Sequence, residues 1–141
     1  MINTILVGTD GSGTAATAVA NAVDMAKAMD AEVIVVSAYP PAKAAAPPFT
    51  ATDSVAGVEV ANGLLEDVQK RHGDGMKLRT VAREGAAADV MLDIAEEENV
   101  DVIIVGNKGM TGAKRFVLGS VPNAISHHAP CHVLIVHTTD E

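Results

Sequence analysis

Four short runs of apolar residues, rich in Val and Ile, constrain the fold of this chain more than any other feature. Each run is continuous rather than alternating, which is typical of strands covered on both faces, as in a parallel sheet. A fifth segment, residues 77–83, alternates charged with smaller residues and predicts a partly exposed strand at a sheet edge. The four continuous runs are TILVG (4–8), EVIVVSA (32–38), DVIIVG (101–106) and HVLIVH (132–137).

Between these runs lie four segments with helical patterns, in which apolar residues recur at intervals of three and four. The first of them starts at Ser12, a residue type that caps helix N-termini. Right-handed crossovers then place helices on both faces of the sheet. The sequence therefore predicts a Rossmann-like α/β fold, a single domain over 1–141 with a doubly wound, five-stranded parallel sheet. The helical segments are 12–30, 53–71, 86–99 and about 121–128.

The periodic positions predict which side of each helix packs on the sheet. Residues 96–98, three glutamates on the polar face of the third helix, are interpreted as a solvated acidic surface. The predicted buried positions are Ala15, Val19, Val23, Ala26 and Met29 in the first helix, Val60, Leu64, Leu65 and Val68 in the second, and Ala87, Val90, Met91, Ile94 and Ala95 in the third.

The charge distribution excludes some partners and favours another. The chain carries a formal net charge of -8 and only 2% aromatic residues, which argues against binding nucleic acid. Residues 102–139, however, contain no carboxylate and carry three positive charges, on Lys108, Lys114 and Arg115. This local positive segment indicates a small anion as ligand.

No apolar run approaches the roughly 18 residues of a membrane span, so no membrane partner is expected. The N-terminal residues lack the pattern of a secretory signal, and we therefore expect a cytoplasmic protein. Cys131 is the single cysteine, which excludes an internal disulfide.

The segment GNKGMTGAKRFVLGS (106–120) has the parts of a phosphate-binding loop. In an open doubly wound sheet, ligands bind beyond the carboxyl ends of the strands, and this segment follows one of them. Gly106 and Gly109 permit positive φ and close backbone approach. Gly119 and Ser120 precede the last helix, whose free amides, together with the Ser120 hydroxyl, suit an anion.

Each of these residues has an alternative interpretation when taken alone. In these alternative interpretations, Gly109 and Gly112 are turn glycines and Ser120 is an ordinary N-cap. The basic residues are then solvated loop charges. The Walker pattern is also missing, because Gly112 is followed by Ala113, and GTDGSG (8–13) does not match the dinucleotide fingerprint. Taken together, the residues still favour a phosphate loop at the end of an apolar strand.

The spacing Gly106-x2-Gly109-x9-Gly119-Ser120 resembles the nucleotide-binding signature of the universal stress protein family. The opening ILVGTDGS and the ending HAPCHVLIVH are similar as well, so the resemblance runs essentially end to end. In that family the signature marks members able to bind ATP. The segments GSVPNAISHHAP and VLIVHTT also resemble an actinobacterial branch of that family, which is linked to cyclic AMP binding.

The resemblance implies an adenine nucleotide, ATP or cyclic AMP, with or without Mg²⁺, and it implies site residues. Asp10 is expected by the adenosine, where its alternative interpretation is an Asx-turn or a helix cap. Lys108 supplies charge nearby. The residues implied at the phosphates are Gly109, Gly119 and Ser120, with Gly106 and Val121 shaping the pocket; those at the adenine are Thr9, Val36, Ser37 and Ala38.

Three hypotheses about function follow. The preferred one is a stress-response or signalling module that binds an adenine nucleotide, with no catalytic residues assigned. The alternative is a weak ATPase or nucleotide-transforming enzyme that acts by positioning. The third is a ligand-free interaction module whose glycines serve only turns.

Residues 126–137 bear on two further questions: whether the protein forms a dimer and whether it binds a metal. An apolar last strand at a sheet edge needs covering, and antiparallel pairing of residues 131–137 with a second copy provides it. The resemblance implies the same homodimer. A metal site in the cluster SHHAPCH (126–132) is disfavoured, because Pro130 splays the ligands and the spacing matches no standard zinc pattern.

Overall fold

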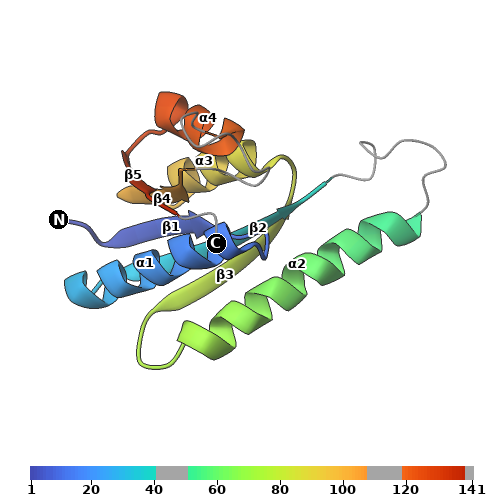
Figure 1. Ribbon diagram of the computed structural model, residues 1–141, viewed down its shortest axis with the longest axis horizontal. Coiled ribbons are helices and arrows are strands. Elements are labelled where there is room, and N and C mark those ends of the chain that lie inside the picture. Colours follow the sequence, from blue (N-terminus) through green and yellow to red (C-terminus); the bar gives the residue numbers. More distant parts are fainter. Residues whose placement is uncertain (41–50, 108–118, 139–141) are drawn as a thin grey trace.

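A computed structural model describes residues 1–40, 51–107 and 119–138, in which strands and helices alternate along the chain (Figure 1). The strands are β1 (Thr4–Gly8), β2 (Glu32–Tyr39), β3 (Leu78–Glu84), β4 (Val102–Gly106) and β5 (His132–Val136). The helices are α1 (Gly13–Met29), α2 (Ala51–His72), α3 (Ala87–Glu97) and α4 (Ser120–His128). Within the part of the chain that the structure describes, no helix is both long and apolar enough to cross a bilayer.

The strands form one parallel sheet in the order β3-β2-β1-β4-β5, which confirms the predicted doubly wound fold. The central strand β1 pairs with β2 on one side and β4 on the other, so that Leu6 lies between Ile34 and Ile103. The edge position predicted for the third strand is confirmed, and β5 forms the opposite edge. The strand order reverses at β1 and β4, whose carboxyl ends lie side by side.

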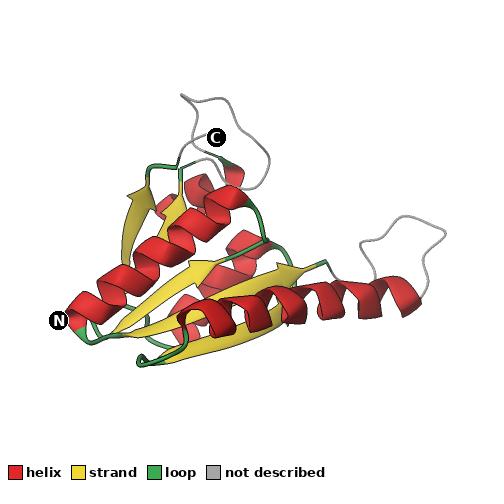
Figure 2. Cartoon of the chain, turned by 60° about the horizontal axis from the view of Figure 1, so that its bottom comes forward, coloured by secondary structure: helices red, strands yellow, loops and turns green. Residues whose placement is uncertain are grey.

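Helices cover both faces of the sheet, which explains the continuous apolar runs. Ile5 and Val7 pack with α1 and α2 on one face, whereas Leu6 packs with α3 and α4 on the other. Figure 2 shows α1 and α2 in front of the sheet and the other two helices behind it. Ile5, Leu6 and Val7 are all fully buried, so the three consecutive central positions of this strand must be apolar.

Two apolar positions predicted to be buried are exposed instead, Met29 by 45% and Val60 by 63%. Met29 is the last residue of α1, and the chain leaves the helix directly after it through Asp30, which has a left-handed backbone. In α2, the contact with the sheet is made by Ala61, Leu65 and Val68, a stripe that leaves the neighbouring Val60 outside.

Small residues add contacts that the sequence did not predict. Ala18 and Ala22 are buried in α1 between the predicted Val19, Val23 and Ala26, and they let the helix approach the sheet closely. In α3 the predicted stripe is buried from Val90 onward.

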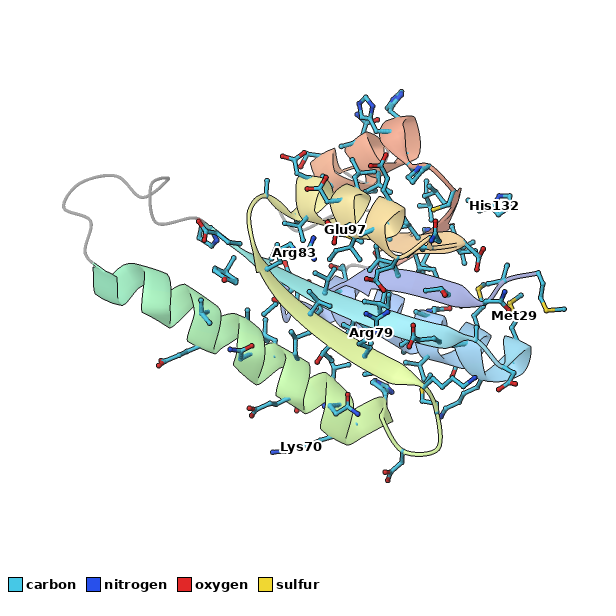
Figure 3. All side chains as sticks on the ribbon, turned by 180° about the vertical axis from the view of Figure 1, so that it is seen from behind. Met29, Lys70, Arg79, Arg83, Glu97 and His132 are labelled. Carbon is cyan, nitrogen blue, oxygen red and sulfur yellow. The ribbon has the colours of Figure 1, made fainter. Side chains whose placement is uncertain are left out.

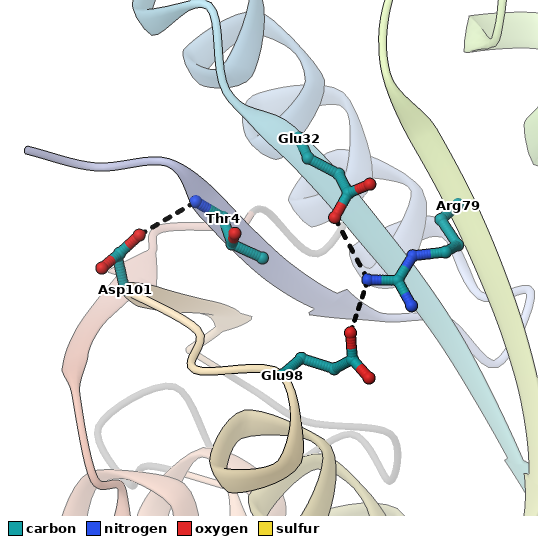
Figure 4. Close-up of polar contacts among 5 residues, drawn as sticks. All are labelled: Thr4, Glu32, Arg79, Glu98 and Asp101. Carbon is teal, nitrogen blue, oxygen red and sulfur yellow. Dashed lines mark hydrogen bonds and ion pairs between the residues drawn. The ribbon is translucent and has the colours of Figure 1, made fainter.

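The sequence suggested that the acidic end of α3 is a solvated surface. It is exposed, but two of its carboxylates also pair with arginines of β3. Arg83 donates two hydrogen bonds to the Glu97 carboxylate, 2.9 and 3.0 Å long, and Arg79 Nη2 contacts Glu98 at 2.7 Å and Glu32 at 3.1 Å (Figures 3 and 4). The hydrogen bonds with Arg83 lower the pKa of Glu97. Exposed ion pairs each contribute little to the free energy of unfolding. These pairs join the end of α3 to the edge strand β3.

A carboxylate at the start of β4 fixes the N-terminal strand. Asp101 Oδ2 accepts hydrogen bonds from the backbone N–H groups of Asn3, at 2.8 Å, and Thr4, at 3.0 Å; Figure 4 shows the second. These bonds lower the pKa of Asp101. The N-terminal amine and His132 lower it further, by their charge.

Asp101→Asn is therefore expected to lower the free energy of unfolding at neutral pH by about 1 kcal/mol, because charged acceptors make the stronger hydrogen bonds. The pKa is lower in the folded state, so this stabilisation is present above the ordinary aspartate value of 3.8 and is lost as the pH falls through the folded value. Urea unfolding at neutral pH and at about pH 3 checks it. Asp24→Asn, at an exposed site on α1, is the control, and an equal effect of both substitutions would contradict the role of Asp101.

Candidate functional site

A pocket lies where β1 and β4 end and α1 and α4 begin. The pocket itself is small, with room of about 40 Å³, and it opens widely to solvent. The first turns of two helices reach it, through Ser12 and Thr14 on one side and Val121 and Pro122 on the other. The remaining lining residues are Gly8, Ala15, Ala18, Met91, Ile104, Val105 and Gly106.

The two glycines that end the central strands leave room for their neighbours. A Cβ atom on Gly8 would lie 3.0 Å from Met91 Sδ, and one on Gly106 would lie 3.3 Å from Thr138 Cγ2. Among the described glycines, positive φ occurs at Gly11, Gly75 and Gly85 and not at Gly106. Gly106 is the last residue of an extended strand, so its role is close packing rather than a left-handed turn.

The N-terminus of α4 borders this pocket without a side-chain cap. Gly119 is the N-cap residue, with φ −60° and ψ 164°, and is buried. Ser120 is the first residue of the helix and is exposed, so its alternative interpretation as the N-cap is wrong. The amides of Ser120 and Val121 have no acceptor within the helix, and Pro122 has no amide hydrogen. This end of the helix suits an anion.

The loop between β1 and α1 is held by its own side chains. Asp10 Oδ1 accepts a hydrogen bond from Ser12 N at 2.9 Å, which confirms the alternative interpretation of Asp10 as an Asx-turn. Thr9 is buried, and its Oγ1 accepts from Gly11 N at 3.2 Å. Gly11 has φ +85°, and a Cβ atom there would lie 2.7 Å from the Leu64 side chain, so this position requires glycine.

The predicted cap of α1 is also confirmed. Ser12 Oγ accepts a hydrogen bond from Ala15 N at 3.2 Å and lies 3.1 Å from Thr14 Oγ1. The exposed carboxylate of Asp10 retains acceptor capacity beyond its bond to Ser12, since a carboxylate has about four lone-pair sites. It is thus fixed in place and still able to bind a ligand hydroxyl or amine.

A second pocket, open to solvent and with room of about 310 Å³, lies at the end of β2 beside α2. It brings together Asp10, Ser37 and Ala38, as the sequence predicts for the adenosine end of the site. The Val36 side chain packs instead into the core beneath α3, and its carbonyl oxygen accepts from Thr9 N at 2.9 Å. The pocket is completed by Tyr39, Pro40, Gly57, Val60, Ala61 and Leu64.

Two polar residues beside Gly106, Asn107 and Thr138, were not identified from the sequence. Asn107 follows β4, and its Oδ1 accepts from both Thr138 N, at 2.9 Å, and Thr138 Oγ1, at 2.8 Å. The carbonyl oxygen of Asn107 accepts from Gly119 N at 3.2 Å. Thr138, two residues after β5, is 1% exposed. Only the tertiary structure joins these residues, although a polar pair directly after two apolar strands was a weak signal.

Residues 1–137 match the model of the universal stress protein family. The chain belongs to this family. It is 39% identical over 142 residues to universal stress protein Rv1636 of Mycobacterium tuberculosis, covering 96% of this chain and 97% of that one. It is 31% identical over 153 residues to universal stress protein YxiE of Bacillus subtilis, covering 96% and 99% of the two chains. The resemblance seen in the sequence is confirmed.

Solved structures share the fold of this universal stress protein along nearly its whole length. One is a universal stress protein in complex with cyclic AMP, which is 29% identical, covers 97% of this chain and 98% of that one, and superposes with a TM-score of 0.75. Another is the hypothetical protein MJ0577, 28% identical over 100% of this chain and 99% of that one, with a TM-score of 0.88.

Four further residues singled out in the sequence of this universal stress protein are not among the described ones. Lys108, Gly109, Lys114 and Arg115 fall outside the described residues. Among the described residues, no three His, Cys, Asp or Glu side chains are placed to share a metal ion. Cys131 is partly buried, and this burial raises the pKa of its thiol.

Proposed function

We propose that this universal stress protein binds an adenine nucleotide, ATP or cyclic AMP, and acts as a stress-response or signalling module. The observation that carries the proposal is the N-terminus of α4, which opens onto a pocket at the switch point of the sheet and has no side-chain cap. The cyclic AMP complex of a relative that is 29% identical supports the choice of ligand.

The nucleotide would extend from α4 toward α2. Its phosphate would accept hydrogen bonds from the amides of Ser120 and Val121, aided by the Ser120 hydroxyl and the helix dipole. Its adenosine would occupy the second pocket, where Asp10 accepts hydrogen bonds from ribose hydroxyls or the adenine amine. Any Mg²⁺ would then arrive with the phosphates.

The lining of the first pocket limits how hydrolysis could be catalysed there. Its described residues offer the hydroxyl groups of Ser12 and Thr14, and none of them is a carboxylate, histidine or lysine. A general base must lie within hydrogen-bond reach of the attacking water. The described lining supplies no such group, so an enzyme at this site would have to act by positioning alone.

Calorimetric titration with ATP, ADP, AMP and cyclic AMP, with and without Mg²⁺, is expected to show binding of at least one of them. Incubation of the ATP complex is expected to release phosphate no faster than ATP does in buffer. Absence of binding by all four nucleotides would contradict the proposed function, and release above the buffer rate would favour the enzyme.

We also propose that the protein is a homodimer through β5. This edge strand keeps Leu134 and Ile135 exposed, by 37% and 40%, although both belong to a continuous apolar run. Apolar edge strands associate unless they are covered. Antiparallel pairing with a second copy about a two-fold axis covers both strands at once.

A further inference from the structure

Asn107 connects three parts of the structure that surround the phosphate end of the proposed site. Its N–H donates to Val136 O, at the end of β5, at a distance of 2.9 Å. Its carbonyl oxygen accepts from the N–H of Gly119, the N-cap residue of α4. Its side-chain oxygen accepts two hydrogen bonds from Thr138. A single residue thus joins the end of β4 both to the edge strand and to the start of the helix.

The side chain of Asn107 is required because Thr138 is almost fully buried. The N–H and hydroxyl of Thr138 both need an acceptor in a site that is 1% exposed. Asn107 Oδ1 satisfies both at 2.8–2.9 Å, and without it a buried donor would be left unpaired. The methyl group of Thr138 also lies in the space that Gly106 leaves open.

These bonds restrain the peptide group of Asn107, on which Gly119 depends. Rotation of that peptide would move the carbonyl oxygen away from Gly119 N and shift the first turn of α4. An anion bound at a helix N-terminus is sensitive to such a shift, because the amides must point at it. The side-chain bonds oppose the rotation.

We propose that Asn107 is a positioning residue for nucleotide binding: held by Thr138, it sets the N-terminus of α4 at the place where a phosphate group binds. The inference rests on the proposed function and adds a residue to it. Asn107 acts through Gly119 and the helix, and its own contact with the ligand is not required.

The test compares three variants, Asn107→Ala, Thr138→Val and Thr138→Ser, by calorimetric titration with ATP, cyclic AMP and adenosine. Adenosine lacks the phosphate and serves as the matched ligand. Asn107→Ala is expected to weaken binding of the preferred nucleotide at least about tenfold, because the amides at the start of α4 would no longer be held pointing at the phosphate. Its effect on adenosine is expected to stay below about threefold.

Thr138→Val removes the hydroxyl and keeps the shape of the side chain. It is expected to lower the nucleotide affinity, but less than Asn107→Ala does. Thr138→Ser keeps the donor and is expected to preserve the nucleotide affinity. If Asn107→Ala does not fold, the comparison of Thr138→Val with Thr138→Ser tests the proposal.

Equal losses for nucleotide and adenosine would indicate general destabilisation and overturn the inference. Unchanged nucleotide affinity in Asn107→Ala and Thr138→Val would overturn it as well, while leaving the proposed function intact. If the unaltered protein binds none of the three ligands, the proposed function fails, and the inference fails with it.

Discussion

Gly119→Asp is expected to weaken nucleotide binding about a hundredfold and to leave the fold intact. The backbone of Gly119, at φ −60° and ψ 164°, is accessible to any residue. Aspartate is among the preferred N-cap residues and interacts favourably with the helix dipole. Its carboxylate would, however, stand where the phosphate binds. Two like charges about 4 Å apart repel by about 4 kcal/mol near a protein surface, more than a hundredfold loss requires.

Gly119→Asn is the matched control for this experiment. Asparagine has the size of aspartate and is an equally good N-cap, so both variants share any cost of placing a side chain at this buried position. The two differ in one charge. Calorimetric titration should therefore show binding to the Asn variant that is much tighter than to the Asp variant, and thermal unfolding should give similar midpoints for the two.

Equal affinities of the Asp and Asn variants for the nucleotide would contradict a phosphate at this helix end. Adenosine gives a further comparison, because it carries no charge and should distinguish the two variants little. A loss for adenosine as large as for ATP would place the effect in the pocket shape rather than in electrostatics.

The fold was predictable because its signal is carried by local patterns. A strand buried on both faces must be apolar at each position, and Ile5, Leu6 and Val7 show this directly. The errors occurred where a helix leaves the sheet or turns slightly on it. Met29 and Val60 continue the apolar period of their helices, and only the packed structure shows that the sheet does not reach them.

The candidate site was predictable in its location and less so in its contacts. The carboxyl ends of parallel strands meet at one edge of a sheet, so Asp10, Ser37 and Ala38 come together as expected. The bond between Asn107 and Thr138 joins residues 31 positions apart, a separation at which no periodic pattern operates. Such tertiary hydrogen bonds depend on the register of the strands, which the sequence alone does not state.

Ile135→Lys is expected to convert a dimer into a monomer. The Ile135 side chain is 40% exposed on the edge strand, whereas Val133 and Val136 pack against the two cores, so the substitution should spare the folded chain. In a paired interface the new ammonium group would be buried without a partner, at a cost of several kcal/mol. Two-fold symmetry doubles this cost, because each copy contributes one lysine.

Met29→Lys is the matched control, because it places the same charge on another exposed apolar residue, at the end of α1 (Figure 3). Sedimentation at micromolar concentration should give twice the 14.4 kDa chain mass for the unaltered protein and for this control. The Ile135→Lys variant should give the mass of one chain. A monomeric unaltered protein would contradict pairing through β5, as would a dimer that survives the lysine. Because Ile135 lies on the edge strand, loss of the dimer in a variant that still unfolds cooperatively would assign the interface to β5 itself.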